Sequence, residues 1–138
     1  MIQFPVLRFN FEIRKDHIEN IFLNHNSQIS TMKRIEAIVQ SEISKKVVNA
    51  ISKKNGVGGV TLIQSLGQGA GERPEIGGHQ IEFNSTDIIV TVVQDSVVQS
   101  VVSEIIETAH TGAKGDGKIF VTNVEESYDI STKKNLLN

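Results

Sequence analysis

The chain of 138 residues contains no cysteine and no tryptophan, and these absences exclude several kinds of site. Without cysteine it can form no disulfide bond, thiolate metal site or cysteine nucleophile, which fits an intracellular protein. Aromatic residues make up only 5% of the chain, so no stacking platform for nucleic-acid bases is evident. The formal net charge is −2, and so weak a field recruits neither nucleic acid nor an anionic membrane. We therefore expect an intracellular protein without a nucleic-acid partner.

Long hydrophobic runs and clustered metal ligands are missing as well. No apolar stretch approaches the roughly 20 residues that a membrane-spanning helix needs, so we expect no insertion into a membrane. The four histidines are widely spaced, and none pairs with another at metal-ligand spacing. We therefore predict no metal site.

Hydrophobic periodicity predicts one folded domain over residues 32–138. The strand patterns alternate apolar and polar residues, except that residues 88–93 are nearly continuously apolar, whereas the helix patterns repeat at helical spacing. Ser41 and either Asp95 or Ser96 have the chemistry of helix N-caps. Strands are expected at residues 32–40, 60–66, 80–93 and 118–124, and helices at 41–54 and 95–110. This β-α-β-β-α-β order predicts an α+β fold of the ferredoxin-like type, with two helices on one face of an antiparallel four-stranded sheet.

The two ends of the chain differ from this central pattern. Residues 1–31 carry four of the six phenylalanines and end in a polar, turn-like stretch from Asn24 to Thr31. They are either a docking arm or an N-terminal extension with little structure of its own, and we favour the second interpretation. Residues 132–138 are expected to form a polar tail.

The most informative stretch is residues 111–118, TGAKGDGK, which hold three of the eleven glycines and two lysines. Successive glycines let backbone N–H groups converge on an anion, and Lys118 adds a mobile positive charge. The stretch is not a P-loop, because Ile119 stands where that motif needs Ser or Thr and because the order is helix, loop, strand. Two interpretations remain open: a phosphate-handling loop, or a connection whose glycines serve turn geometry alone.

Asp116 lies in this stretch and could be considered as a catalytic acid. No companion base or nucleophile lies near it in the sequence, so a turn-stabilising role is the better expectation. We predict that the protein is not an enzyme.

A second glycine-rich stretch covers residues 67–79, with five glycines and one proline. This composition excludes a helix or a central strand. The stretch is longer than a hairpin requires, and loops of this length inside a compact domain are usually functional or disordered. We expect a flexible loop that extends from the sheet.

Four ordered landmarks carry a resemblance to a known family, namely residues 32–38 (MKRIEAI), 67–69 (GQG), 111–121 (TGAKGDGKIFV) and 124–126 (VEE). From Met32 onward the chain resembles the P-II nitrogen-regulatory signalling family. Residues 32–38 resemble that family's first strand, and 67–69 resemble the Gly-Phe-Gly that begins its long effector loop. Residues 111–121 resemble its most distinctive motif.

The resemblance implies a cytoplasmic homotrimer with nucleotide sites in the clefts between subunits. Such proteins bind ATP or ADP competitively and, with magnesium-ATP, 2-oxoglutarate. By the same resemblance, the phosphates would be lined by Gly115, Asp116, Gly117 and Lys118. Thr61 and Gly67 would lie near the base, Gly69 would begin the effector loop beside the nucleotide, and Thr111 and Gly112 would shape the glycine-rich turn.

The resemblance also implies a protein target, either an ammonium transporter or a metabolic enzyme. The flexible loop over residues 67–79 would dock on it, through the candidate effector residues Gly71, Arg73, Glu75, Gly77 and His79. The loop contains no tyrosine, so the uridylylation that the family carries on a loop tyrosine should be absent.

Three departures from the family pattern remove positive charge from the implied nucleotide site. Ala70-Gly71 follow the first landmark of the loop where the family has Arg-Gln. Thr86 or a close neighbour stands where the family has a lysine, and residues 129–131 (DIS) replace its Arg-x-Arg. These losses predict weakened or altered nucleotide binding that favours AMP or ADP over ATP, and they argue against a 2-oxoglutarate response. A further alternative is a protein-interaction scaffold that has lost small-molecule sensing.

Overall fold

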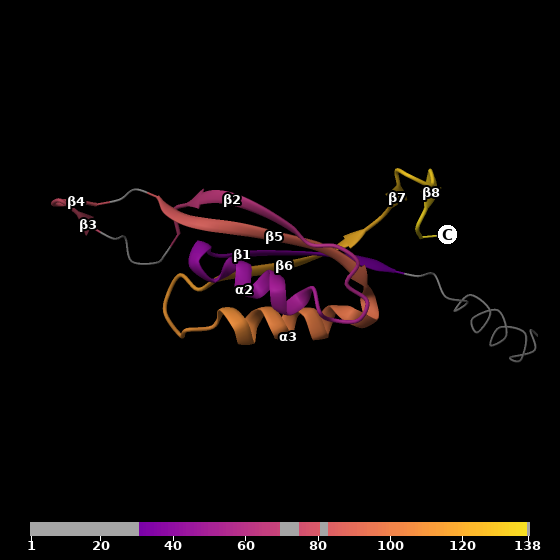
Figure 1. Cartoon of the computed structure of the whole chain (residues 1–138), viewed down its shortest axis with the longest axis horizontal. Helices are drawn as coiled ribbons and strands as arrows, with labels where there is room; N and C mark the ends of the chain where they lie inside the picture. Colours follow the sequence, from indigo (N-terminus) through magenta and orange to yellow (C-terminus); the bar gives the residue numbers. More distant parts are fainter. Residues whose placement is uncertain (1–30, 70–74, 81–82, 138) are drawn as a thin grey trace, which may run out of the picture.

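The computed structural model describes residues 31–69, 75–80 and 83–137 (Figure 1). Its long elements are β1 (Met32–Gln40), α2 (Ser41–Ile51), β2 (Thr61–Gly67), β5 (Asn84–Gln94), α3 (Val98–Ala109) and β6 (Gly117–Val124). Shorter ones are β3 (Glu75–Ile76), β4 (His79–Gln80), the 3-10 turn η1 (Asp95–Val97), β7 (Tyr128–Asp129) and β8 (Lys134–Asn135). The predicted docking arm or extension lies outside the described residues, apart from Thr31.

The long strands form one antiparallel sheet in the order β2-β5-β1-β6. β1 pairs with β5 on one side and with β6 on the other, and Ala37 lies opposite both Ile89 and Ile119. Figure 1 shows α2 and α3 on the same side of this sheet. The predicted ferredoxin-like fold is therefore confirmed.

The core lies between the helices and one face of the sheet. Alternate residues of β1 and β5 point into it, as the period of two in a strand requires, and the helices add residues at intervals of three to four. The fully buried large side chains are Ile35, Ile51, Ile89, Ile105, Val47, Val93 and Val101. Each contributes roughly 1.5–3 kcal/mol of burial free energy relative to an exposed side chain.

Both helices begin differently from the sequence prediction. Ser41 is the first residue of α2 rather than its N-cap, and the second helical segment starts with η1, so that Val97 precedes α3. No side chain caps either helix through a backbone N–H. The hydroxyl of Ser41 instead donates to Asp87 on β5 at 2.9 Å, and the hydroxyl of Ser44 donates to the same carboxylate at 2.5 Å. A carboxylate supplied by the sheet therefore lies at the positive end of α2.

The face of the sheet away from the helices is partly apolar. Ile63, Ile88 and Ile38 lie side by side across β2, β5 and β1. Phe120 on β6 lies opposite Glu36, with 49% of its surface exposed, and Ile63 is 47% exposed. No described helix is long and apolar enough to cross a membrane. This open face is available to another protein surface.

Two small hairpins extend from opposite ends of the sheet (Figure 1). One consists of β3 and β4, joined by Gly77 and Gly78 with positive φ angles of 62° and 80°. The other consists of β7 and β8, so that part of the segment expected as a polar tail is paired with Tyr128 and Asp129. The sequence prediction missed this pairing because two-residue strands leave almost no periodic pattern.

Candidate functional site

The glycine loop, residues 110–117, is held in shape by the carboxylate of Asp116. Oδ2 accepts hydrogen bonds from the backbone N–H groups of Thr111 and Gly112 at 2.8 and 2.9 Å, and Oδ1 accepts one from the Thr111 hydroxyl. His110 Nδ1 lies 3.6 Å from Oδ2. This is the turn-stabilising role expected from the sequence.

These contacts also set the charge state of Asp116. The Thr111 hydroxyl and then the Thr111 N–H lower the pKa of the carboxyl below its usual value of 3.8, while desolvation opposes them in part. The Gly112 N–H and the nearby His110 lower it further. Asp116 is therefore ionised at neutral pH and places a negative charge at the end of the loop.

The end of the loop is packed against β1. Gly117 has a φ of 123°, and a Cβ atom at this position would lie 1.9 Å from the backbone oxygen of Ile38. Only glycine fits here. The side-chain amide of Gln40 donates to the backbone oxygen of Gly115 at 2.6 Å, which ties the end of β1 to the loop.

A cavity of about 290 Å³ opens where the glycine loop meets the base of the second glycine-rich segment. It includes five residues that the sequence analysis assigned to nucleotide binding, namely Gly67, Gly69, Gly115, Gly117 and Lys118. We refer to it as the strand-end cavity. It also includes five lining residues that the site prediction did not contain, namely Ile38, Gln40, Gln68, Asn84 and Thr86.

The added residues come from strand ends beside the predicted loops. Ile38 and Gln40 alternate with the core residues of β1, so they face the opposite side of the sheet. Asn84 pairs with Gly67, and Thr86 pairs with Ser65, whose hydroxyl lies 3.0 Å from that of Thr86. Alternation along β1 could have indicated Ile38 and Gln40. Asn84 and Thr86 depend on the register between β2 and β5, which the sequence does not reveal.

The remaining residues of the predicted nucleotide set lie outside the strand-end cavity. Thr61 is at the other end of β2, opposite Val90. Thr111 and Gly112 bind the Asp116 carboxylate, as described above. Asp116 itself lines a second cavity of about 450 Å³ between α3 and β6. That second cavity is mainly apolar, and its wall includes Val102, Ile105, Ile106, Ile119 and Val121.

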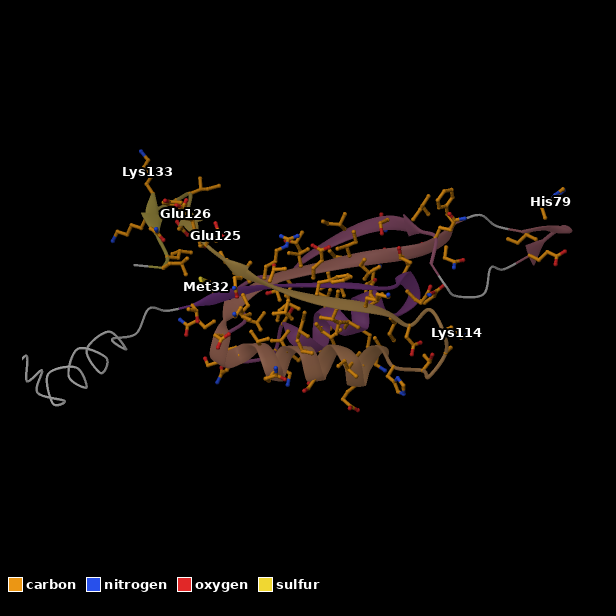
Figure 2. The ribbon with its side chains drawn as sticks, turned by 180° about the vertical axis from the view of Figure 1, so that it is seen from behind. Met32, His79, Lys114, Glu125, Glu126 and Lys133 are labelled. Carbon is orange, nitrogen blue, oxygen red and sulfur yellow. The ribbon has the colours of Figure 1, made fainter. Side chains whose placement is uncertain are left out.

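The candidate effector residues are only partly within the described chain. Glu75, Gly77 and His79 are exposed in the β3–β4 hairpin, whereas Gly71 and Arg73 lie outside the described residues. Figure 2 shows His79 at the same end of the molecule as Lys114 of the glycine loop. Met32, Glu125 and Lys133 lie at the opposite end. The lysines of the C-terminal hairpin are therefore far from the strand-end cavity of their own chain.

Charge in the strand-end cavity is concentrated on one residue. Lys118 has no carboxylate within 4 Å among the described residues, whereas Lys33 and Lys54 are paired with Asp95 and Glu104. No group of three or more His, Asp or Glu side chains in the described part of the chain could hold a metal ion. The cavity therefore offers one cation, glycine backbone and neutral amide and hydroxyl groups, a combination suited to an anionic ligand with polar edges.

Known proteins are similar to this chain over the folded region described above. The family model described as nitrogen regulatory protein P-II matches residues 32–134. The chain is 37% identical over 105 residues to the nitrogen regulatory protein P-II of Porphyra purpurea, covering 73% of this chain and 93% of the relative. It is 32% identical over 102 residues to a nitrogen fixation nifHD region glnB-like protein of Methanococcus maripaludis, covering 74% and 96%.

A solved structure shows the same similarity in three dimensions. The crystal structure of Arabidopsis thaliana PII bound to citrate matches with a TM-score of 0.62 and 32% sequence identity. The match covers 77% of this chain and 86% of that chain. Residues 1–31 lie outside the region that the family model matches.

Proposed function

The chain belongs to the nitrogen regulatory protein P-II family, and from that premise we propose that it binds an adenine nucleotide in the strand-end cavity and signals its presence to a protein target. Proteins of this family are regulatory signal transducers rather than enzymes. The targets are a transporter or an enzyme of nitrogen metabolism, and the contact is made through the segment over residues 67–79. The protein works in the cytoplasm.

One observation carries this proposal: Lys118 and the glycines of two distant segments line a single cavity. Glycine backbone can approach a phosphate closely, and a lysine without a carboxylate partner in the described chain can neutralise it. The polar side chains of Gln40, Gln68 and Asn84 supply donors and acceptors for a base or a ribose. Magnesium would accompany the ligand only if that ligand is ATP.

The same cavity contains both ends of the connection between β2 and β5, which includes the proposed effector segment. Gly67 ends β2, Asn84 begins β5, and the two residues are paired. A ligand that contacts them differently in two conformations of the segment shifts the population between those conformations, without any chemistry on the ligand. This links occupancy of the cavity to the surface presented by the β3–β4 hairpin.

We further propose that three copies assemble through the open face of the sheet. Ile63 and Phe120 are about half exposed there, and Ile38, Ile88 and Val90 lie between them in the sheet. Large exposed apolar side chains on one sheet face mark an interface with another protein surface. Trimerisation would bring the strand-end cavity close to a neighbouring subunit.

A citrate-bound relative of the same fold supports a site for small anions.

Titration calorimetry with AMP, ADP and ATP tests the nucleotide half of the proposal. We expect at least one of them to bind, and Lys118→Ala to weaken that binding by roughly 10- to 100-fold, as loss of a charge-assisted hydrogen bond does. Lys114→Ala is the matched control, because it removes the same charge from the same loop at a residue outside the cavity wall. Failure of all three nucleotides to bind would remove this part of the proposal.

The rival function is an interaction scaffold that keeps the assembly but senses no small molecule. The neutral side chains at Gln40, Gln68, Asn84 and Thr86 favour it, because a polyphosphate site usually gathers several cations. Under this alternative, Lys118→Ala leaves capture of the protein target unchanged. Under the sensing proposal, the same substitution changes target capture when nucleotide is present.

A further inference from the structure

We propose that residues 1–30 of the chain, here called the N-terminal segment, cover an apolar groove between α3 and β6 of their own chain. Residues 7–13 would lie there as an added strand along the free edge of β6. This is the docking role that the sequence analysis gave as its second interpretation. It concerns a different surface from the proposed nucleotide site and does not depend on any ligand.

The groove is the cavity of about 450 Å³ described above, and its two long walls are apolar. The α3 wall contains Val102, Ile105, Ile106 and Ala109, and the β6 wall contains Ile119 and Val121. Ile106 is 49% exposed and Val121 is 44% exposed, so both walls present apolar surface to the outside. Apolar surface gathered in one place in this way marks a site of interaction.

The groove lies on the helix side of the sheet. Ile119 and Val121 are paired with Ala37 and Ile35, which are buried in the core. Residues directly opposite each other in a sheet share a face, so Ile119 and Val121 also point toward the helices. The proposed trimer interface is the other face of the sheet. Assembly of three copies through that face would therefore leave the groove uncovered.

The backbone of β6 is also open along one edge. β6 stands last in the sheet order β2-β5-β1-β6 and pairs with β1. No other strand of the described chain pairs with its outer edge. An extended segment laid along such an edge would satisfy the unpaired N–H and C=O groups while its side chains enter the adjoining groove.

The N-terminal segment has the sequence pattern that this groove requires. Leu7, Phe9, Phe11 and Ile13 recur at every second position, with Arg8, Asn10 and Glu12 between them. In a strand, successive side chains point to opposite faces. Residues 7–13 would therefore place four large apolar side chains in the groove and three polar ones in solvent.

The connection to β1 starts beside the edge that the segment would cover. Met32 is paired with Val124, the last residue of β6, so the chain before β1 starts next to the end of that strand. The eight residues of β6 span about 27 Å at roughly 3.3 Å per residue. Residues 14–30 can span up to roughly 56 Å when extended. Residues 7–13 can therefore reach the groove within their own chain.

Limited trypsin digestion of the full chain tests whether the groove is covered by this segment. Cleavage after Arg8 requires residues 7–13 to leave the groove, so its rate follows the undocked population. We expect Ile106→Glu to raise that rate by about tenfold or more, because it places a charge in the apolar wall. Val121→Glu makes the same change in the opposite wall and serves if Ile106→Glu folds poorly.

Ile130→Glu is the matched control, because Ile130 is 94% exposed in the C-terminal hairpin and lies outside the groove wall. It should leave cleavage after Arg8 unchanged. If the wild-type chain is cleaved there as fast as Ile106→Glu and Val121→Glu, the segment does not occupy the groove and the proposal is wrong.

The absence of cysteine allows a second test, which identifies the chain that supplies the segment. Ser103 is exposed on α3, one turn before Ile106 of the groove wall. In the double variant Asn10→Cys and Ser103→Cys, a short bismaleimide should join the two cysteines within one chain. Asn49→Cys replaces Ser103→Cys in the control, because Asn49 is exposed on α2, which does not line the groove. This control pair should not be joined.

Two outcomes of the cross-linking experiment would overturn the proposal. If the product runs as two joined chains on a denaturing gel, a neighbouring copy supplies the segment. If Asn10→Cys reacts with Ser103→Cys no better than with Asn49→Cys, residues 7–13 do not lie beside α3.

Discussion

The two glycine-rich segments of this protein have similar compositions but are built in different ways. In the glycine loop after α3, glycine makes close packing possible: Gly117 lies against the backbone of β1, and Asp116 accepts hydrogen bonds from Thr111 and Gly112. In the β3–β4 hairpin, glycine serves only the turn. Gly77 and Gly78 have positive φ angles, and a Cβ atom at either position would meet nothing within 4 Å.

This difference indicates how the two segments divide the work of a regulator. The glycine loop is fixed to the sheet through Gln40 and Gly117, so it can hold a ligand group in one place. The hairpin has exposed side chains on both short strands and can present its surface to a partner. Glycine content alone does not distinguish these roles, whereas the atoms that surround each glycine do.

The largest effect is expected from Gly117→Ala. A methyl group 1.9 Å from the backbone oxygen of Ile38 cannot be accommodated, so β6 must separate from β1 or shift along it. We expect a loss of about 3 kcal/mol or more in the free energy of unfolding, measured by chemical denaturation. Gly58→Ala is the control, since its Cβ would meet nothing within 4 Å and its φ is not positive. An unchanged denaturation midpoint for Gly117→Ala would show that the loop is not fixed as described.

An intermediate effect is expected from Asp116→Asn. The neutral amide is a weaker acceptor for Thr111 and Gly112, so the amide hydrogens of these residues should exchange roughly tenfold faster. Asp129→Asn is the control, because Asp129 makes the same kind of turn with Ser131 and Thr132 in the C-terminal hairpin. That substitution should leave exchange in the glycine loop unchanged.

The same carboxylate predicts a pH dependence for the loop. The pKa of Asp116 is lower in the folded chain than its ordinary value of 3.8. Its contribution to stability is therefore complete above pH 3.8 and is lost as the pH falls through the lower folded value. The protection factors of the Thr111 and Gly112 amides, which are corrected for the intrinsic pH dependence of exchange, should fall in that acid range, and Asp116→Asn should remove this step. Unchanged protection across that acid range in the wild-type chain would contradict the assignment.

The smallest effect on stability is expected from Ile76→Ser in the hairpin. Ile76 is 68% exposed and lies in a two-residue strand that pairs only with β4. The free energy of unfolding should change by less than about 0.5 kcal/mol. Capture of the protein target should nevertheless weaken, because an exposed apolar side chain at the hairpin tip is suited to contact a partner. A large loss of stability would show that the hairpin packs on the sheet.

The sequence predicted the fold well because the periodic segments are long. Ile35, Ala37 and Val39 recur at every second position of the first strand, and the structure buries all three. Helix starts were predicted less well. Ser41 looks like an N-cap by its chemistry, but its hydroxyl bonds Asp87 from a strand more than forty residues away, and local sequence cannot reveal such a partner.

The candidate site was predictable in part. Its glycines and Lys118 stand out in the sequence, because clustered glycines and a nearby cation have a recognisable purpose. Asn84 and Thr86 do not stand out, since polar residues at strand ends are ordinary, and only the register between β2 and β5 brings them beside Gly67. The role of Asp116 toward a ligand stays a prediction, and in the structure its carboxylate is bound by Thr111 and Gly112.

The pairing of Gly67 with Asn84 has a mechanical consequence. These two residues are the first and last of the excursion between β2 and β5, and both line the strand-end cavity. A ligand in this cavity would therefore contact the excursion at the two points where it leaves and rejoins the sheet.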